Sequence, residues 1–241
     1  VKLGMSEKEV GAELVMQLFM AGSETTLPFM PIIASGPQNS PNPHAFVSDR
    51  TLAAGDLVVI DWGAAYDGYF SDITRTFAVG EVSDELKTIH DTVHRANQAA
   101  HAAVKPGVTC GSVDKAARDV IDAAGYGQYF THRLGHGLGL DGHEDPYMRG
   151  DNQQLLEPGM TFTIEPGIYV MGKGGVRIED DVIVTEDGVR SFTDLPRETQ
   201  VIGASERGRT HEPPHHSHRS ITLLPTGQHN RLTHGAQLHR I

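Results

Sequence analysis

Residues 57–79, with the sequence LVVIDWGAAYDGYFSDITRTFAV, indicate the fold that we expect for this chain. Its β-branched and aromatic residues predict two strands, Leu57–Ala64 and Tyr69–Val79. The turn residues Tyr66-Asp67-Gly68 stand between these runs. We therefore expect the two strands to pair as a hairpin.

The same arrangement returns in the second half of the chain. Strands are expected near Thr161–Val170 and Gly175–Thr185, joined through Gly172-Lys173-Gly174. Apolar residues at helical spacing predict three helices, which cover roughly residues 6–22, 83–104 and 112–124. Each half thus offers helix and hairpin, and we expect an α+β protein whose two halves face each other across their strands.

Each expected hairpin carries two carboxylates at positions where the strand pattern calls for apolar residues. Asp61 and Asp72 belong to the first hairpin, and Glu165 and Glu179 belong to the second. An ionised carboxylate in apolar surroundings is costly unless it is paired or coordinates a metal. Two such pairs would also repel strongly without cations between them. The four side chains therefore predict a metal site.

A glycine-rich segment, His132–Glu144, adds imidazole side chains to this set. Its alternating glycines let the backbone approach a ligand closely. We expect His136 to supply the one nitrogen ligand and His143 to donate a hydrogen bond to a substrate. The alternative is a glycine-rich turn with surface histidines.

The combined ligand set predicts a reaction class. Four carboxylates and one imidazole suit two hard divalent cations that share bridging carboxylates, about 3.5–4 Å apart. Such a pair offers a hydroxide nucleophile at neutral pH and polarises a carbonyl. The expected chemistry is metal-assisted hydrolysis, most naturally of an amide.

Several runs of sequence, in this order and spacing, then point to a family. They are Ile60–Thr76, His132–Tyr147, Gly159–Gly167 and Gly175–Asp180. Together they resemble the "pita-bread" metallopeptidases, most closely Xaa-Pro aminopeptidase and Xaa-Pro dipeptidase (prolidase), over roughly residues 5–203. The resemblance implies a pita-bread fold, in which two pseudo-symmetric α+β halves with antiparallel sheet form a central cleft.

The resemblance also assigns each ligand to a metal ion. Asp61 would chelate one ion, and Asp72 and Glu179 would bridge both. His136 and Glu165 would bind the other ion. Manganese fits this carboxylate-rich set best, with cobalt, zinc or iron as the family's other choices.

The catalytic and substrate-binding roles follow from the same resemblance. Glu165 would handle the protons of the bridging hydroxide, and His44 and His143 would act on the substrate side. Arg177 would place the substrate or support the site. The alternatives are an exposed turn histidine for His44 and a salt bridge to Asp or Glu for Arg177.

The function implied is that of a dinuclear metallo-exopeptidase, an Xaa-Pro aminopeptidase or dipeptidase. It would hydrolyse the bond between an N-terminal residue and a following proline. A methionine aminopeptidase with the same ligands is one alternative, and a non-catalytic pita-bread scaffold that binds peptides or proteins is another. A metal-free, creatinase-like hydrolase is disfavoured because it has no need of so many carboxylates.

Composition narrows the class of protein further. With 241 residues, the chain can bury a substantial core, and its net charge of −11 argues against a nucleic-acid partner. No apolar run is long enough to span a bilayer, so no membrane partner is expected. The single cysteine, Cys110, excludes an internal disulfide framework and fits a cytoplasmic location.

The composition changes near residue 204. Residues 1–204 are expected to form the catalytic domain, without the N-terminal domain that usually precedes it in the family. Residues 205–241 contain many His, Arg and Pro residues and are expected to be a disordered tail. Peptides with proline second are the expected partners, together with a second copy of the chain in a homodimer.

Overall fold

The computed structural model describes residues 1–203, so the prediction for 205–241 lies outside the described residues. In the first half, the elements are α1 (Glu7–Met20), β1 (Ile32–Ser35), α2 (Gly36–Asn39), β2 (Leu57–Trp62), β3 (Ala65–Tyr66), β4 (Tyr69–Phe70) and β5 (Ile73–Val79). In the second half, they are α3 (Asp84–Ala103), α4 (Cys110–Ala123), η1 (Gly127–Tyr129), β6 (Gly135–Gly137), β7 (Glu144–Met148), β8 (Thr161–Ile164), β9 (Gly167–Val170), β10 (Gly174–Arg177), β11 (Asp180–Val184), β12 (Val189–Ser191) and β13 (Gln200–Ile202).

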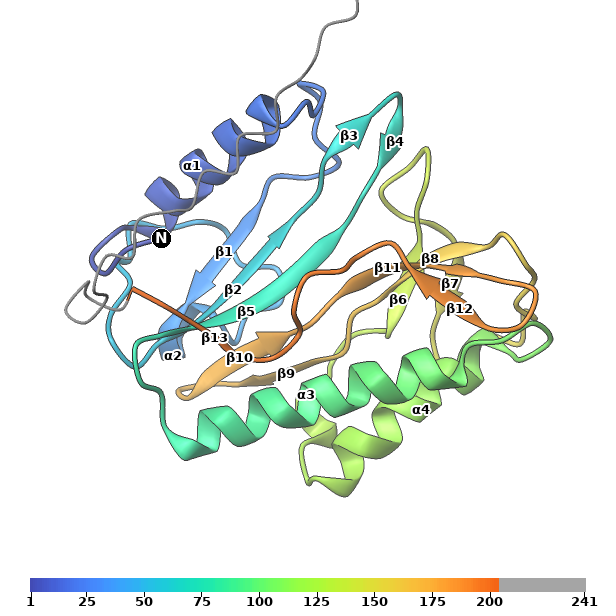
Figure 1. Cartoon of the computed structure of the whole chain (residues 1–241). Helices are drawn as coiled ribbons and strands as arrows, with labels where there is room; N and C mark the ends of the chain where they lie inside the picture. Colours follow the sequence, from blue (N-terminus) through green and yellow to red (C-terminus); the bar gives the residue numbers. More distant parts are fainter. Residues whose placement is uncertain (204–241) are drawn as a thin grey trace, which may run out of the picture. The chain divides into compact units, whose positions relative to one another are not determined.

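Two larger sheets organise these elements (Figure 1). The first has the order β1-β2-β5-β13, and the second has the order β12-β11-β8-β6-β7. All pairs are antiparallel except β13, which lies parallel to β5. The chain therefore returns to the first sheet after it has completed the second, which ties the two halves together.

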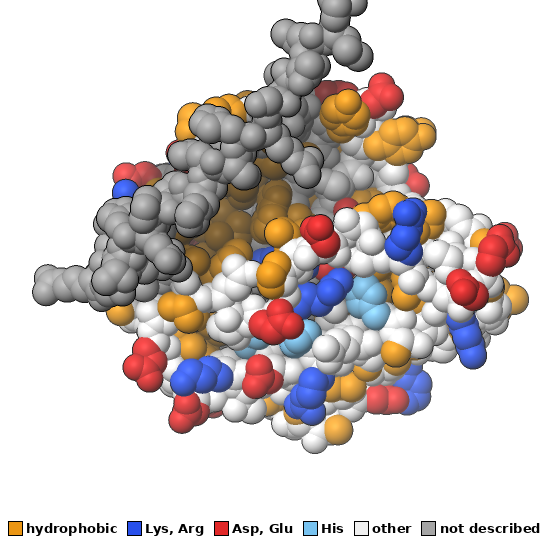
Figure 2. All heavy atoms as spheres, viewed as in Figure 1, with side chains coloured by type: hydrophobic (Ala, Val, Ile, Leu, Met, Phe, Trp, Pro, Cys, Tyr) orange, Lys and Arg blue, Asp and Glu red, His pale blue; other side chains and the backbone are white. Residues whose placement is uncertain are grey.

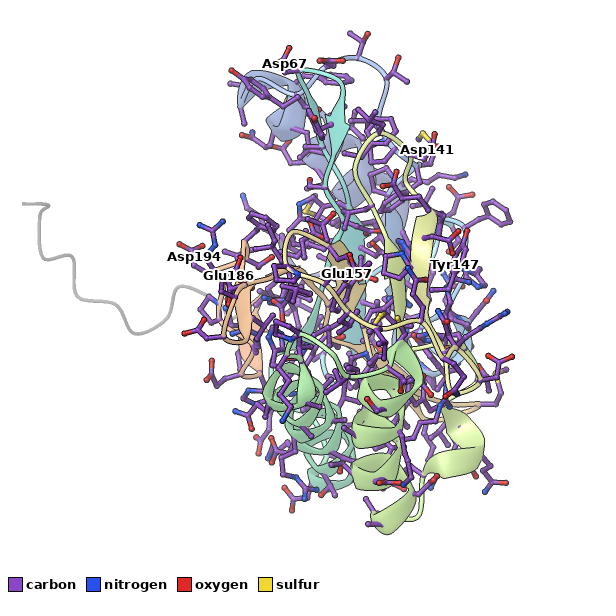
Figure 3. The ribbon with its side chains drawn as sticks, turned by 90° about the vertical axis from the view of Figure 1, so that its right-hand side faces the viewer. Asp67, Asp141, Tyr147, Glu157, Glu186 and Asp194 are labelled. Atoms are coloured by element: carbon purple, nitrogen blue, oxygen red, sulfur yellow. The ribbon has the colours of Figure 1, made fainter. Side chains whose placement is uncertain are left out.

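The first predicted hairpin is confirmed, with an irregular tip. β2 and β5 pair over six residues of each strand, and β3 and β4 form a two-stranded extension. Asp67 and Gly68 have φ values of 51° and 78°, which match the Asp-Gly turn that the right-handed twist of a hairpin favours. Figure 3 shows Asp67 at the extreme end of this extension.

The second hairpin differs from the two continuous strands expected. Its inner part forms a separate pair, β9 with β10, and its outer part is the β8–β11 ladder of the second sheet. The break falls at Glu165-Pro166 on one side and at Ile178-Glu179 on the other. Proline has no N–H to donate to a ladder, which explains the interruption after β8. Both carboxylates therefore lie at breaks in strands.

The predicted helices are confirmed, with shifted ends. Ser6 and Glu9 form a capping box at the start of α1, and Ser83 caps α3. α4 begins at Cys110, two residues before the predicted start, because the Thr109 side chain accepts a hydrogen bond from the Ser112 N–H. α1 lies over the first sheet, while α3 and α4 lie side by side below the second (Figure 1).

The apolar core follows this division. α1, β1 and β2 enclose a smaller cluster that includes Val10, Ile33 and Ile60. The larger cluster lies between α3, α4 and the strands of the second half, and it contains the Cys110 side chain. Within residues 1–203, no helix is both long enough and apolar enough to cross a membrane.

Candidate metal centre

Five predicted residues, which lie in strands or directly beside them, come together in the fold. Asp61 lies in β2, Asp72 directly precedes β5, and His136 lies in β6. Glu165 follows β8, and Glu179 lies between β10 and β11. Four of the five are buried, and the Glu165 side chain is only 14% exposed. The fold thus brings charged groups from both halves into one buried place.

The distances within this cluster are short. His136 Nε2 lies 3.7 Å from Asp72 Oδ2 and 3.5 Å from Glu165 Oε1. One potential ligand atom each from Asp72, His136 and Glu179 lie within 4.8 Å of one another. An ion placed among them would contact donor atoms from both halves of the chain.

Burial and mutual repulsion disturb the protonation of the carboxylates. Burial and the neighbouring Glu179 raise the pKa of Asp72 well above its usual range. Burial and the neighbouring Glu165 do the same to the pKa of Glu179. Burial raises the pKa of Glu165 to about 7, although Arg177 acts against the shift. The cluster therefore holds more negative charge than it can keep without cations.

The histidine of the cluster is in the form that binds metals. Burial lowers the pKa of His136 to about 3, so its ring is neutral at pH 7. Its Nδ1 lies 3.0 Å from the Gly137 carbonyl oxygen, where a ring N–H can donate. That tautomer leaves the lone pair of Nε2 directed at the carboxylates.

Unpartnered oxygens show that these residues fit divalent cations. Asp61 Oδ1 and Glu179 Oε1 are buried and have no hydrogen-bond partner among the described residues. Buried polar atoms without partners are rare, and a bound ion is one of the ordinary explanations. Carboxylate oxygens with one imidazole also form the donor set that hard divalent metals prefer.

Two threonines, which sequence reasoning missed, hold the ligands in place. The Thr74 hydroxyl donates to Glu179 Oε2 at 2.6 Å, and the Thr163 hydroxyl donates to Glu165 Oε1 at 3.2 Å. Thr163 Oγ1 also accepts the His136 N–H at 3.1 Å. Each threonine lies two residues from a carboxylate on its own stretch of chain. Residues two apart on a strand point to the same face, so this spacing could have suggested that each threonine lies beside the ligands.

Asp181 is a further supporting residue that was missed. One of its carboxylate oxygens accepts the Asp72 N–H at 2.9 Å, while the other, Oδ1, is buried and has no hydrogen-bond partner within residues 1–203. Burial raises the pKa of Asp181 to about 7. The successive acidic residues after Ile178 were the available signal.

Arg177 is paired with Asp61. Its guanidinium donates to Asp61 Oδ2, to the Thr74 hydroxyl, to the Tyr169 hydroxyl and to the Pro43 carbonyl. The salt bridge weighed as an alternative is therefore present. Substrate contact by Arg177 stays a prediction.

The two predicted substrate-side histidines border a cavity beside the cluster. His44, in the loop after α2, and His143, in the loop before β7, are both exposed and line this cavity of about 820 Å³. The rings of His136 and His143 lie 4.0 Å apart between centroids. Apolar side chains from α1 and from residues 29–32 and 45–47 line much of the remaining wall, and Figure 2 shows hydrophobic side chains in a hollow on this face.

Comparison with known proteins identifies the class to which this fold and cluster belong. The model of metallopeptidase family M24 matches residues 1–186. The chain belongs to metallopeptidase family M24. Members use divalent metals, which agrees with the buried cluster of Asp72, His136 and Glu179. The resemblance predicted from sequence is thus confirmed.

Two of the similar curated proteins are Xaa-Pro dipeptidases. The chain is 42% identical over 203 residues to Xaa-Pro dipeptidase of Lactobacillus delbrueckii subsp. lactis, covering 84% of this chain and 55% of that protein. It is 46% identical over 195 residues to Xaa-Pro dipeptidase of Pyrococcus furiosus, covering 81% of this chain and 56% of the relative. The chain thus spans about half the length of the curated relatives that it matches.

Solved structures confirm the pita-bread α+β fold. Xaa-Pro dipeptidase from Bacillus anthracis matches with a TM-score of 0.82 and 46% identity, covering 84% of this chain and 56% of that one. X-Pro aminopeptidase from Thermotoga maritima matches with a TM-score of 0.81 and 44% identity, covering 84% and 57%. Both named activities concern a bond to proline.

Proposed function

We propose that this chain carries the active site of a metallo-exopeptidase that hydrolyses the bond between an N-terminal residue and a following proline. The observation that supports it most is the convergence of four carboxylates and one neutral imidazole, in which two buried ligand oxygens have no hydrogen-bond partner in the described part of the chain. The Xaa-Pro specificity follows the names of the relatives. The expected homodimer belongs to the same proposal.

Two divalent cations, most naturally manganese, would be held by the five residues. Asp61 would bind one ion, Asp72 and Glu179 would bridge, and His136 and Glu165 would bind the second. The unpartnered Asp61 Oδ1 and Glu179 Oε1 support the first two assignments. The chemistry supplied by bound ions is a water made nucleophilic at neutral pH and a polarised carbonyl.

The protein's own groups would perform the remaining steps. Glu165, whose carboxylate lies 3.5 Å from His136 on the wall of the cavity, would accept a proton from the attacking water and return it. His143 and His44 would donate hydrogen bonds to the substrate, since both line the cavity beside the ligands. Arg177 would orient Asp61 through their ion pair.

A comparison of substrates tests this proposal. Metal-depleted protein is incubated with manganese and either Ala-Pro or a Met-Ala-Ser peptide, and cleavage is followed by chromatography. We expect cleavage of Ala-Pro only, dependent on metal. Cleavage of Met-Ala-Ser instead would favour a methionine aminopeptidase. If neither peptide is cleaved, with or without manganese, the result would favour a peptide-binding scaffold.

A further inference from the structure

Arg133 is a cation on the wall of the cavity. It lines the same cavity as the metal cluster, yet among residues 1–203 no carboxylate forms a salt bridge with it. Its Nε is buried and has no hydrogen-bond partner in the described part of the chain. A guanidinium with an unsatisfied donor beside a reactive site points to a ligand that is absent here.

The other cations of the cavity wall are already engaged. Lys8 lies 2.9 Å from the Asp49 carboxylate, and Arg177 pairs with Asp61. Of the lysines and arginines on this wall, Arg133 therefore has its charge available for a substrate.

The guanidinium is held in place by an aromatic ring. The Arg133 Cζ lies 5.1 Å from the centroid of the Tyr147 ring, within the range of a cation–π contact. Tyr147 belongs to β7, and Figure 3 shows it on that strand. A rigid strand thus supplies the platform, which lowers the entropy lost when the arginine binds a ligand.

Arg133 also lies close to the reactive groups. Burial lowers the pKa of His143, and the charge of Arg133 adds to this effect. Arg133, His143 and Glu165 line the same cavity, so a substrate bound at the ligands would lie beside the guanidinium.

Building on the proposed function, we infer that Arg133 binds the free C-terminal carboxylate of the substrate and thereby selects dipeptides. One residue spans about 3.5 Å of extended chain, so in a dipeptide the carboxylate lies one residue beyond the scissile bond. A longer peptide presents a neutral carbonyl at the same place. Arg–carboxylate pairs are frequently bidentate, so the two substrates should be clearly distinguished.

The test compares a dipeptide with its uncharged analogue. The kcat/KM values of manganese-loaded protein are measured for Ala-Pro, for Ala-Pro amide and for Ala-Pro-Ala. We expect Ala-Pro to exceed the other two by at least about 30-fold. In Arg133→Met the value for Ala-Pro should fall at least about 30-fold further than that for the amide, mainly through KM. The kcat/KM of Arg133→Lys for Ala-Pro should lie between the values of the wild type and Arg133→Met, because lysine keeps the positive charge and lacks the paired N–H donors of a guanidinium.

Arg149→Met is the matched control, because Arg149 is exposed and pairs with Asp151. This variant should behave as the wild type. The inference is overturned if the wild type does not prefer the dipeptide. It is also overturned if Arg133→Met lowers both activities in proportion, with a lower melting temperature, since that marks a structural role.

Failure of the proposed function is a separate result. If the wild type cleaves none of the three peptides, that function is rejected. Calorimetric binding of Ala-Pro and Ala-Pro amide then decides the role of Arg133. Tighter binding of the free carboxylate, lost in Arg133→Met, supports the inference, and equal binding of the two contradicts it.

Discussion

At the scale of single residues, Thr74 is the support that connects the two halves of the metal cluster. Its hydroxyl donates to Glu179 in the second half and accepts from Arg177, which in turn holds Asp61. Supporting contacts of this kind orient ligands and tune their affinity. The geometry of three site residues therefore depends on one hydroxyl.

Replacing this hydroxyl should weaken metal binding. We predict that Thr74→Val lowers the affinity for manganese by about 10–100-fold, as measured by calorimetry with metal-depleted protein. Thr92→Val is the control, because Thr92 is a buried threonine whose hydroxyl bonds the Thr88 carbonyl within α3. Equal affinities in all three proteins would contradict the role given to Thr74.

His90 offers a test of acid stability away from the metal cluster. Burial lowers the pKa of this helix α3 histidine to about 4, and its Nδ1 has no partner among the described residues. The stabilisation from its neutral form is present above pH 6.5 and is lost as the pH falls towards 4. The free energy of unfolding should fall by at most about 1.4 kcal/mol per pH unit in this range.

The prediction is that His90→Gln flattens this dependence. Urea unfolding at pH 7 and pH 4.5 should show a smaller difference in the free energy of unfolding than in the wild type. His94→Gln, one helical turn away, is the control. The account of His90 is wrong if the wild type and His90→Gln lose the same free energy between the two pH values.

The ligands could be predicted at this scale because they break a pattern. Asp61 and Glu165 stand where a strand should be apolar, so their chemistry is visible without a structure. Thr74 and Thr163 could not be singled out, because threonine is an ordinary strand residue. Arg133 likewise shows its lack of a partner only once its surroundings are folded.

At the scale of elements, Asp180 joins strands that lie far apart in sequence. This fully buried carboxylate pairs with Arg75 of β5 at 2.7 Å, with Arg197 at 2.7 Å and with His101 of α3 at 3.1 Å. Burial alone would raise the pKa of Asp180, but the hydrogen bonds from His101 and Arg197 bring it below its usual range. The network therefore ties β11 to the first sheet beside the ligand Glu179.

Removing this charge should destabilise the fold strongly. We predict that Asp180→Asn lowers the free energy of unfolding by about 3–5 kcal/mol, because the buried Arg75 loses its partner. The measurement is urea denaturation at pH 7. Asp119→Asn, which removes an exposed pair with Lys115, should change it by less than about 0.5 kcal/mol. Similar losses in both variants would refute the role of Asp180.

The elements themselves were only partly predictable. The first hairpin could be recognised because Asp67-Gly68 supplies a specific turn signal between two strand runs. The second was expected to be continuous, and the effect of Pro166 on the ladder was not anticipated. β6 is only Gly135–Gly137, and so short a glycine-rich segment becomes a strand through pairing with β7 and β8. That pairing is tertiary and leaves no local pattern.

At the scale of the whole molecule, the metal cluster opposes folding when no cation is present. The pKa values of Asp72 and Glu179 are raised well above their usual range, and that of Glu165 is raised to about 7. Because the pKa values of these carboxyl groups are higher in the folded than in the unfolded protein, their protonated forms stabilise the fold, and this stabilisation is complete below pH 4. It is lost as the pH rises through the folded pKa values, that of Glu165 being about 7.

Metal should reverse this trend. We predict that the metal-depleted protein melts at a lower temperature at pH 8 than at pH 5.5, and that manganese raises the melting temperature most at pH 8. Calorimetry in buffers of different ionisation enthalpy should also show protons released on binding. A metal-depleted protein that is equally stable at both pH values would contradict the account.

We propose that residues from both halves of the chain hold two divalent cations at one site. The most direct measurement is an anomalous difference map from crystals soaked in manganese, recorded at its absorption edge. We expect two peaks among the five ligands, which are Asp61, Asp72, His136, Glu165 and Glu179. A well-ordered cleft without a peak there, in protein that cleaves Ala-Pro in the same manganese solution, would contradict it.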